Sequence, residues 1–112
     1  MNRRLFLLGS SFGVAALLAP KVARAEDHLA QAISETKEAI NFALLQDLDQ
    51  LVSHASAALK HAEAAESAKD STETKKAINR LVVTVYDAKK KKFDAATSHA
   101  QEALTHLEAA SK

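Results

Sequence analysis

Apolar residues recur every three or four positions through most of the chain after residue 26, with charged and polar side chains between them. This period is typical of amphipathic helices that share a core. It predicts helices over residues 27–45, 48–67, 72–90 and 94–111. The side chains expected in the core are Leu29, Ile33, Ile40, Leu44, Leu48, Leu51, Val52, Ala55, Leu59, Ala62, Ile78, Leu81, Val82, Val85, Phe93, Ala96, Ala100, Ala103, Leu104 and Leu107, together with Phe42 and Tyr86.

Polar clusters separate the four segments, and each cluster offers residues that begin a helix. Asp47 precedes the second segment, and Asp94 stands at the start of the last. Either Thr72 or Asp70 begins the third segment, and Asp70 and Glu73 have the spacing of a capping box, in which two side chains bond each other's backbone N–H groups. Short connections between four amphipathic helices predict an all-α fold, an antiparallel up-down-up-down four-helix bundle.

The second half of the chain repeats the first with an offset of 45 residues. Ser53 to Ala65 and Ser98 to Ala110 are identical at nine of 13 positions, including both histidines of each copy. The sequence therefore predicts a duplicated αα-hairpin.

The first 25 residues have the order of an export signal. Arg3 and Arg4 precede an apolar run from Leu5 to Ala19, and Ala23-Arg24-Ala25 has the small-x-small form of a cleavage site. The run is too short for a stable membrane span. The paired arginines resemble a twin-arginine signal, with an ordinary secretory signal as the alternative. We expect residues 1–25 to be removed and residues 26–112 to form a periplasmic domain without stable membrane insertion.

Composition then excludes several kinds of site. The chain has no cysteine, which excludes disulfides, thiolate zinc sites and c-type haem attachment. The signal segment carries four basic and no acidic residues, so residues 26–112 hold 11 basic and 14 acidic residues, a net charge of −3. Both glycines and the only proline also lie in the signal segment, and 19 of the remaining 87 residues are alanine. Alanine favours helix and a thin core.

Five histidines carry the candidate chemistry. The heptad frame of the second and fourth segments puts His54, His61, His99 and His106 beside the core, half facing solvent. Histidines seven positions apart on a helix are separated by about 10.5 Å along its axis, so such a pair does not share one metal ion. Each histidine therefore needs a second ligand from elsewhere.

Several residues qualify as that second ligand. Glu102 lies between His99 and His106 on one helix face. His54 has Gln50 or the acids of a neighbouring helix, while His28 has Glu26, Asp27 or the new α-amino group. Imidazole with carboxylate suits copper, zinc or nickel, and intrinsic affinity favours copper(II). The alternative is that these are solvated surface histidines copied along with the hairpin.

The pattern His-Ala-x-x-Ala-Leu-x-His-x-Glu-Ala-Ala, present twice, resembles the periplasmic small metal-binding proteins. That family comprises four-helix bundles with histidine repeats that bind several divalent metals, copper foremost. The resemblance implies metal ligands at His54, His61, His99 and His106, and extends to His28. Where the family pattern would place further histidines, this chain has Glu35, Phe42, Asp47, Arg80, Asp87 and Lys92. The resemblance leaves the three acids among them as possible metal ligands, whereas Arg80 and Lys92 would repel a cation. We therefore expect a lower metal capacity.

Other functions find less support in the sequence. The run Lys89 to Lys92 reads as a solvated helix end, and a net negative domain with few aromatic residues does not suit nucleic acid. No nucleophile–base pair is visible and no cavity is expected, so we do not expect an enzyme. Two functions remain: a monomeric buffer or scavenger of divalent metal ions, or a structural, partner-binding bundle whose metal sites have degenerated.

Overall fold

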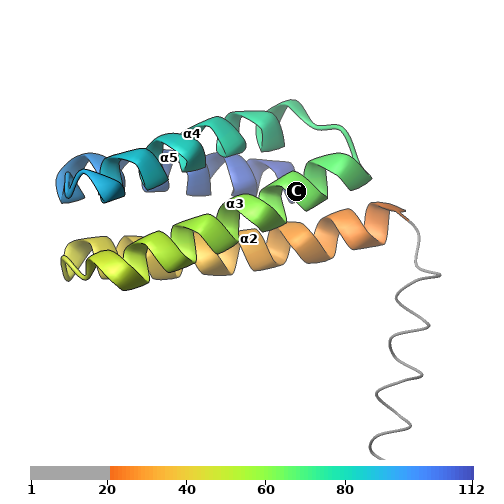
Figure 1. Cartoon of the computed structure of the whole chain (residues 1–112). Helices are drawn as coiled ribbons and strands as arrows, with labels where there is room; N and C mark the ends of the chain where they lie inside the picture. Colours follow the sequence, from red (N-terminus) through yellow and green to blue (C-terminus); the bar gives the residue numbers. More distant parts are fainter. Residues whose placement is uncertain (1–20) are drawn as a thin grey trace, which may run out of the picture.

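The structure, a computed structural model, describes residues 21–112. It consists of four helices, α2 (Lys21–Leu44), α3 (Leu48–Ala68), α4 (Thr72–Lys89) and α5 (Phe93–Ala110), and no strand occurs within these residues. Each helix packs against its two neighbours in the cycle α2, α3, α4, α5, most extensively within the hairpins α2–α3 and α4–α5. The predicted four-helix bundle is confirmed (Figure 1).

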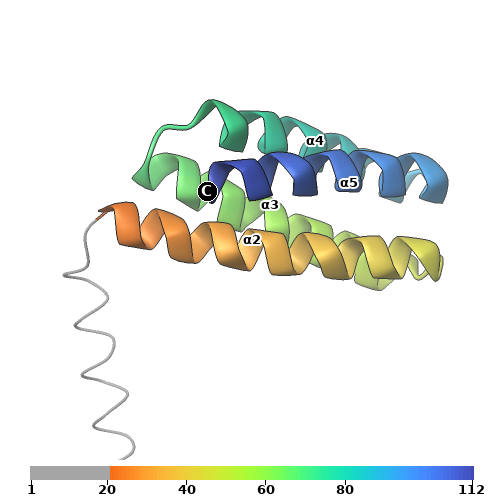
Figure 2. The same ribbon diagram turned by 180° about the vertical axis from the view of Figure 1, so that it is seen from behind.

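The chain runs up and down the bundle, so its connections alternate between two ends. Viewed from behind, α2 and α5 run side by side (Figure 2). The α2–α3 and α4–α5 loops lie at one end. The α3–α4 loop lies at the other end, with the beginning of α2 and the C-terminus.

The predicted signal segment lies only partly within the described residues. Its arginine pair and apolar run fall in residues 1–20, outside them. Residues 21–25 belong to α2, which therefore begins six residues before the predicted first helix. Cleavage after Ala25 stays a prediction. None of the described helices has the length and apolar character needed to cross a membrane.

Alanine makes up most of the core. Besides alanine, the buried apolar side chains are four leucines, Leu29, Leu51, Leu81 and Leu107. Small side chains let the helices approach closely, while each buried leucine removes far more apolar surface from water than an alanine. A few leucines therefore provide much of the hydrophobic stabilisation of this bundle.

Three residues expected in the core are exposed instead. Leu44, Val82 and Tyr86 are 67%, 49% and 57% exposed. Leu44 is the last residue of α2, at the end of the bundle that carries the α2–α3 loop. Val82 and Tyr86 are one turn apart on the outer side of α4, and the Lys90 ammonium lies 4.8 Å from the Tyr86 ring centre. Phe42 packs against the core as expected.

Both hairpin loops have the same backbone, which supports the duplication. In the first loop, Asp47 N–H donates to Phe42 C=O and Gln46 N–H donates to Ala43 C=O, with Gln46 at a φ of 56°. The positions 45 residues later repeat both bonds, and Lys91 has a φ of 61°. This is a Schellman ending, in which a left-handed residue closes the helix.

The helix caps partly follow the sequence prediction. Asp47 caps α3 by accepting a hydrogen bond from Gln50 N–H. Ser71, one residue after the predicted Asp70, caps α4 through Thr74 N–H. Asp94 lies inside the first turn of α5, whose cap position, Lys92, makes no side-chain bond.

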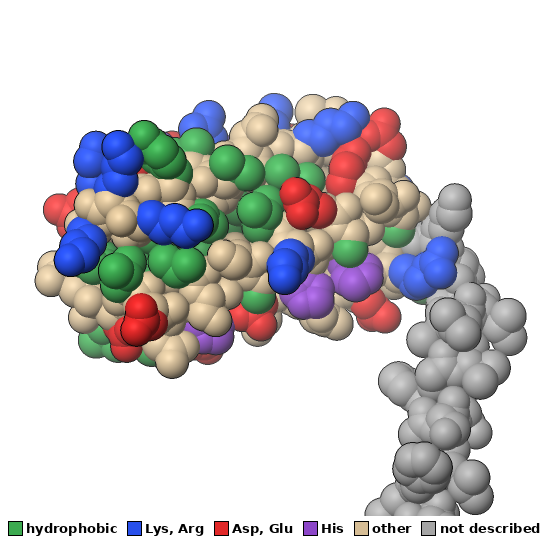
Figure 3. All heavy atoms as spheres, viewed as in Figure 1, with side chains coloured by type: hydrophobic (Ala, Val, Ile, Leu, Met, Phe, Trp, Pro, Cys, Tyr) green, Lys and Arg blue, Asp and Glu red, His purple; other side chains and the backbone are tan. Residues whose placement is uncertain are grey.

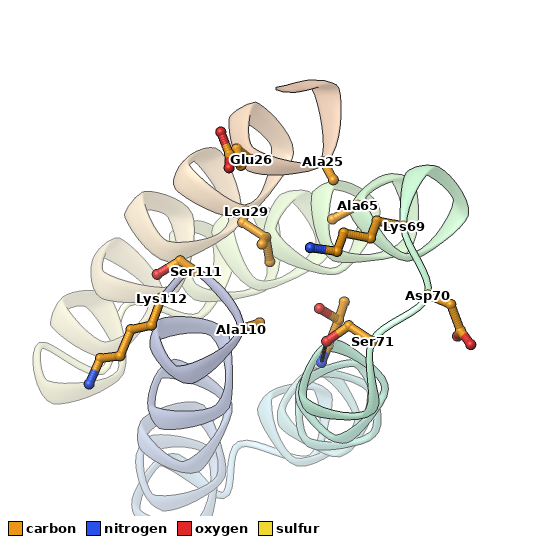
Figure 4. Close-up of a pocket in the computed structure, with 11 residues that line it drawn as sticks. Ala25, Glu26, Leu29, Ala65, Lys69, Asp70, Ser71, Ala110, Ser111 and Lys112 are labelled. Carbon is orange, nitrogen blue, oxygen red and sulfur yellow. Dashed lines mark hydrogen bonds between the residues drawn. The ribbon is translucent and has the colours of Figure 1, made fainter. Parts of the chain in front are cut away.

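The end of the bundle beside the α3–α4 loop holds an open pocket of about 180 Å³ (Figure 4). Its apolar wall includes Ala25, Leu29, Ala65 and Ala110, while Lys69 and the loop residues after it contribute polar groups. The expectation of no cavity was therefore wrong. The pocket lies where α2, α3 and α5 end or begin beside the loop, and only small alanines and Leu29 supply its apolar wall.

Candidate metal centre

All five candidate histidines are half-buried at the edges of the two hairpins. The side chains of His54, His99 and His106 are 27–29% exposed, as expected for positions beside the core. In Figure 3, histidine side chains lie among acidic ones along one rim of the visible face. The imidazoles are thus accessible to small ions while the bundle restricts their movement.

Two histidines meet at the end of the α2–α3 hairpin that lies away from its loop. Nδ1 of His28, on α2, lies 3.2 Å from Nδ1 of His61, on α3. The ring centres are 5.4 Å apart and the planes are inclined by 30°. A hydrogen bond between these two nitrogens needs one ring to donate its Nδ1–H and the other to accept at an Nδ1 that carries no proton.

The other three histidines each contact a carboxylate of the adjacent helix. His54 Nδ1 lies 2.6 Å from Glu35 Oε1, His106 Nδ1 lies 2.7 Å from Glu73 Oε1, and His99 Nδ1 lies 2.9 Å from Asp87 Oδ2. His54 also stacks on Phe42, with ring centres 5.3 Å apart. Every candidate histidine therefore has a second metal-ligand group across its hairpin.

These pairs follow the register of the hairpins. His28 and His61 are equidistant along the chain from the Leu44–Leu45 bond, as are Glu35 and His54. In an antiparallel hairpin, equidistant positions face each other. Glu73 and His106 are the copies of His28 and His61 in the second hairpin, and they too are paired.

Arg80 breaks this symmetry. It is the copy of Glu35 and stands opposite His99, but its guanidinium Nε lies 3.4 Å from Glu102 Oε1. His99 bonds Asp87, one heptad further along α4, at the position that copies Phe42. The structure thus brings Glu102 to a cation, and a metal pairing of Glu102 with His99 or His106 stays a prediction.

The surroundings shift the pKa values of three carboxyl groups, two downward and one upward. The hydrogen bond from His106, together with the Lys76 charge, holds the pKa of Glu73 below its ordinary value. Near the end pocket, burial raises the pKa of Glu66. Hydrogen bonds to Glu66 and Lys75 lower the pKa of Asp70.

The separations of the paired donors are close to those of two ligands on one ion. Metal bonds of about 2.0–2.2 Å at angles between square-planar and tetrahedral place neighbouring donor atoms roughly 2.8–3.6 Å apart. The His28–His61 separation of 3.2 Å falls within this range. The histidine–carboxylate pairs need movements of a few tenths of an ångström or less. Within residues 21–112, no three potential ligands converge on one point.

Sequence reasoning found the histidines but missed most of their partners. The sequence offered Gln50 or the acids of a neighbouring helix for His54, and the resemblance offered Glu35 and Asp87 as ligands without assigning either to a histidine. Neither named His61 for His28 or Glu73 for His106. The missing signal was the hairpin register. Counting equal distances from the Leu44–Leu45 and Lys89–Lys90 bonds gives three of the four pairs. These centres lie before the middle of the predicted loops, so the exact register requires the structure, as does the displacement at Arg80.

A four-helix bundle with imidazole and carboxylate donors paired across each hairpin defines a small protein with candidate metal sites. The small metal-binding protein family matches residues 3–110, and the chain belongs to that family. It is not a family of enzymes. A comparison with curated proteins gives no match.

Proposed function

We propose that this protein is exported to the periplasm and there buffers divalent metal ions, copper(II) first and zinc or nickel second. The observation that supports this most directly is the cross-hairpin pairing of all five histidines. Four pairs of donors lie 2.6–3.2 Å apart on rigid helices. Membership of the small metal-binding protein family points in the same direction.

At each pair a metal ion takes the place of the shared proton. Metal binding requires a neutral imidazole and an ionised carboxylate, so binding releases protons and weakens as the pH falls. At the Glu73–His106 pair, the hydrogen bond that lowers the pKa of Glu73 is the bond that an ion would replace.

Two protein ligands per ion suit a buffer. The remaining coordination positions are filled by water, which exchanges readily, and the histidines are about one quarter exposed. Such sites load and release ions without unfolding the bundle. Copper(II) is preferred because imidazole and carboxylate donors follow the order of intrinsic metal affinity, which peaks at copper. The absence of cysteine leaves no thiolate to retain copper(I).

The test is titration of the full chain with copper(II) and with zinc by calorimetry, alongside thermal unfolding. We expect binding that shifts Tm upward, because an ion at about 100 times its Kd stabilises the folded state by roughly 2.7 kcal/mol. The double variant His99→Ala/His106→Ala should lose the sites of the α4–α5 hairpin and keep those of α2–α3. Binding should decline between about pH 8 and pH 5, where histidine takes up a proton.

The matched control is Gln101→Ala/Thr105→Ala, which alters two exposed positions on the same helix and removes no paired ligand. It should bind like the unaltered chain. If neither metal gives heat of binding or a Tm shift, the proposal is wrong. The pairs are then simple hydrogen bonds that join the helices of a structural or partner-binding bundle.

A further inference from the structure

Removal of the signal segment would leave a distinctive N-terminus. The predicted cleavage after Ala25 exposes the sequence Glu26-Asp27-His28, with a histidine in third position and no proline before it. We propose that this new N-terminus forms a separate chelate for copper(II) or nickel(II), distinct in chemistry from the cross-hairpin pairs.

The chelate uses four nitrogen atoms of three consecutive residues. They are the α-amino nitrogen of Glu26, the backbone amide nitrogens of Asp27 and His28, and Nδ1 of His28. The two amides each lose a proton to solvent when the ion binds, and the amino group loses one if it is protonated. Four nitrogens in a plane are the geometry that copper(II) and nickel(II) prefer. Zinc does not displace amide protons in this way, so it does not form the chelate.

The helix position of these residues makes the chelate accessible only after cleavage. In the full chain, α2 begins at Lys21, so the N–H groups of residues 26–28 have helical acceptors at residues 22–24. Cleavage removes those acceptors together with the peptide bond that blocks the amino group. The first N–H groups of a shortened helix have no intrahelical partner, so they are free to turn toward an ion.

The surroundings allow the first turn to unwind at small cost. Glu26 and Asp27 are exposed, and Figure 4 places Glu26 at the rim of the end pocket. Leu29, which follows the three residues, is only 6% exposed and holds the rest of α2 in the core. Cleavage itself also requires the start of α2 to open, as helix ends do when they fray.

His28 then has two competing partners. Its Nδ1, the atom required by the chelate, is the same atom that lies 3.2 Å from His61 Nδ1. Copper(II) at the N-terminus would therefore draw His28 from the pair and leave His61 free near the site. The inference rests on the proposed export and cleavage, and not on metal binding by the other pairs.

The experiment recovers the protein from the periplasm of a bacterial host that expresses the full chain, and mass spectrometry establishes its first residue. Copper(II) is then added and followed by visible absorption and circular dichroism. We expect the mature chain to begin at Glu26 and to bind one equivalent of copper(II) with an absorption band at shorter wavelength than imidazole–carboxylate copper. Such a band reports amide-nitrogen ligands.

Two substitutions at one exposed position provide matched variants. Asp27→Pro removes one of the required amide N–H groups, and proline is tolerated in the first turn of a helix. Asp27→Ala keeps that N–H. We expect Asp27→Pro and His28→Ala to lose the short-wavelength band, and Asp27→Ala and His61→Ala to keep it. Helical circular dichroism checks that each variant folds.

Three results would overturn the inference: a mature chain that begins elsewhere than Glu26, no such band in the mature chain, or a band that survives Asp27→Pro. Zinc titration of the same samples reports the cross-hairpin pairs alone, because zinc leaves amide nitrogens protonated. Zinc binding without the copper band would contradict this inference and would still support the proposed function. The copper band with neither zinc binding nor any further copper(II) binding that His99→Ala/His106→Ala loses leaves this inference standing and contradicts the proposed function.

Discussion

The two left-handed loop residues lead to a stability prediction. Gln46 and Lys91 have φ values of 56° and 61° and occupy equivalent positions in the two hairpins. Both have a Cβ atom, which crowds the following carbonyl in this conformation at a cost of about 1–2 kcal/mol per residue. Glycine has no such cost, so Gln46→Gly and Lys91→Gly should each stabilise the bundle.

The expected gain is smaller than the strain that is relieved. Glycine also makes the unfolded chain more flexible, which offsets about 0.4–1 kcal/mol. Each substitution should therefore add about 0.5–1 kcal/mol, and the double variant about 1–2 kcal/mol. For a domain of this size, that corresponds to a rise in Tm of roughly 5–10 °C.

The assay is reversible thermal and urea unfolding followed by far-ultraviolet circular dichroism. Lys69→Gly is the matched control, because Lys69 also ends a helix but has an extended backbone with a φ of −153°. Glycine there relieves no strain and should destabilise the chain by about 0.4–1 kcal/mol. A double variant no more stable than the unaltered chain, or a gain in Lys69→Gly as well, would refute the reasoning.

Three further predictions follow from other parts of the structure. Leu81→Ala should cost about 2–5 kcal/mol in urea unfolding because Leu81 is fully buried, whereas Val82→Ala next to it should change stability by less than about 0.5 kcal/mol; equal effects would contradict the assigned core. Lys75→Ala should raise the pKa of both Asp70 and Glu66 in an NMR titration, because Lys75 lowers both, while Lys76→Ala should leave both unchanged. The lowered pKa of Asp70 stabilises the fold above its ordinary pKa, and this stabilisation disappears as the pH falls through the folded-state pKa. The Lys75→Ala variant should therefore lose less stability on acidification than the unaltered chain. An unchanged acid profile and unchanged pKa values would refute the assignment. Arg80→Glu should strengthen metal binding at His99 by about tenfold or more, because the charge opposite a divalent ion changes by two units and each unit-charge pair is worth about 0.4 kcal/mol at about 10 Å in water. Asn79→Glu, which alters charge without facing His99, should have a smaller effect, and equal effects would exclude a direct role.

Much of the fold could be predicted because helical period and loop polarity are local properties. The structure places the beginnings and ends of α3, α4 and α5 within one residue of the sequence prediction. The start of α2 was missed because the apolar-to-polar change at a cleavage site resembles a boundary, although helical hydrogen bonding continues through it. The prediction that Val82 and Tyr86 are buried was wrong because both lie at the margin of the apolar stripe. The sequence of α4 alone does not tell which side of that stripe faces a neighbouring helix.

The candidate site was predictable in its histidines and less so in its partners. Heptad position alone gave the half-buried state of His54, His99 and His106. Their partners depend on the register between helices, which is a property of the whole hairpin. Glu102 illustrates the limit, since its place between two histidines was correct along its own helix, yet Arg80 approaches it from the helix alongside.

The pairs have one more consequence, because each joins helices that follow one another in the chain. His28–His61 and Glu73–His106 each close a segment of 33 residues, and His54–Glu35 closes one of 19. An ion held at these pairs would act as a clip on each hairpin and would leave the seam between the two hairpins to its alanine and leucine packing. Metal binding would then change the order in which parts of the bundle unfold. The hairpins would separate as intact units before either one unravels, and amide hydrogen exchange would be slowed more within the hairpins than along the seam.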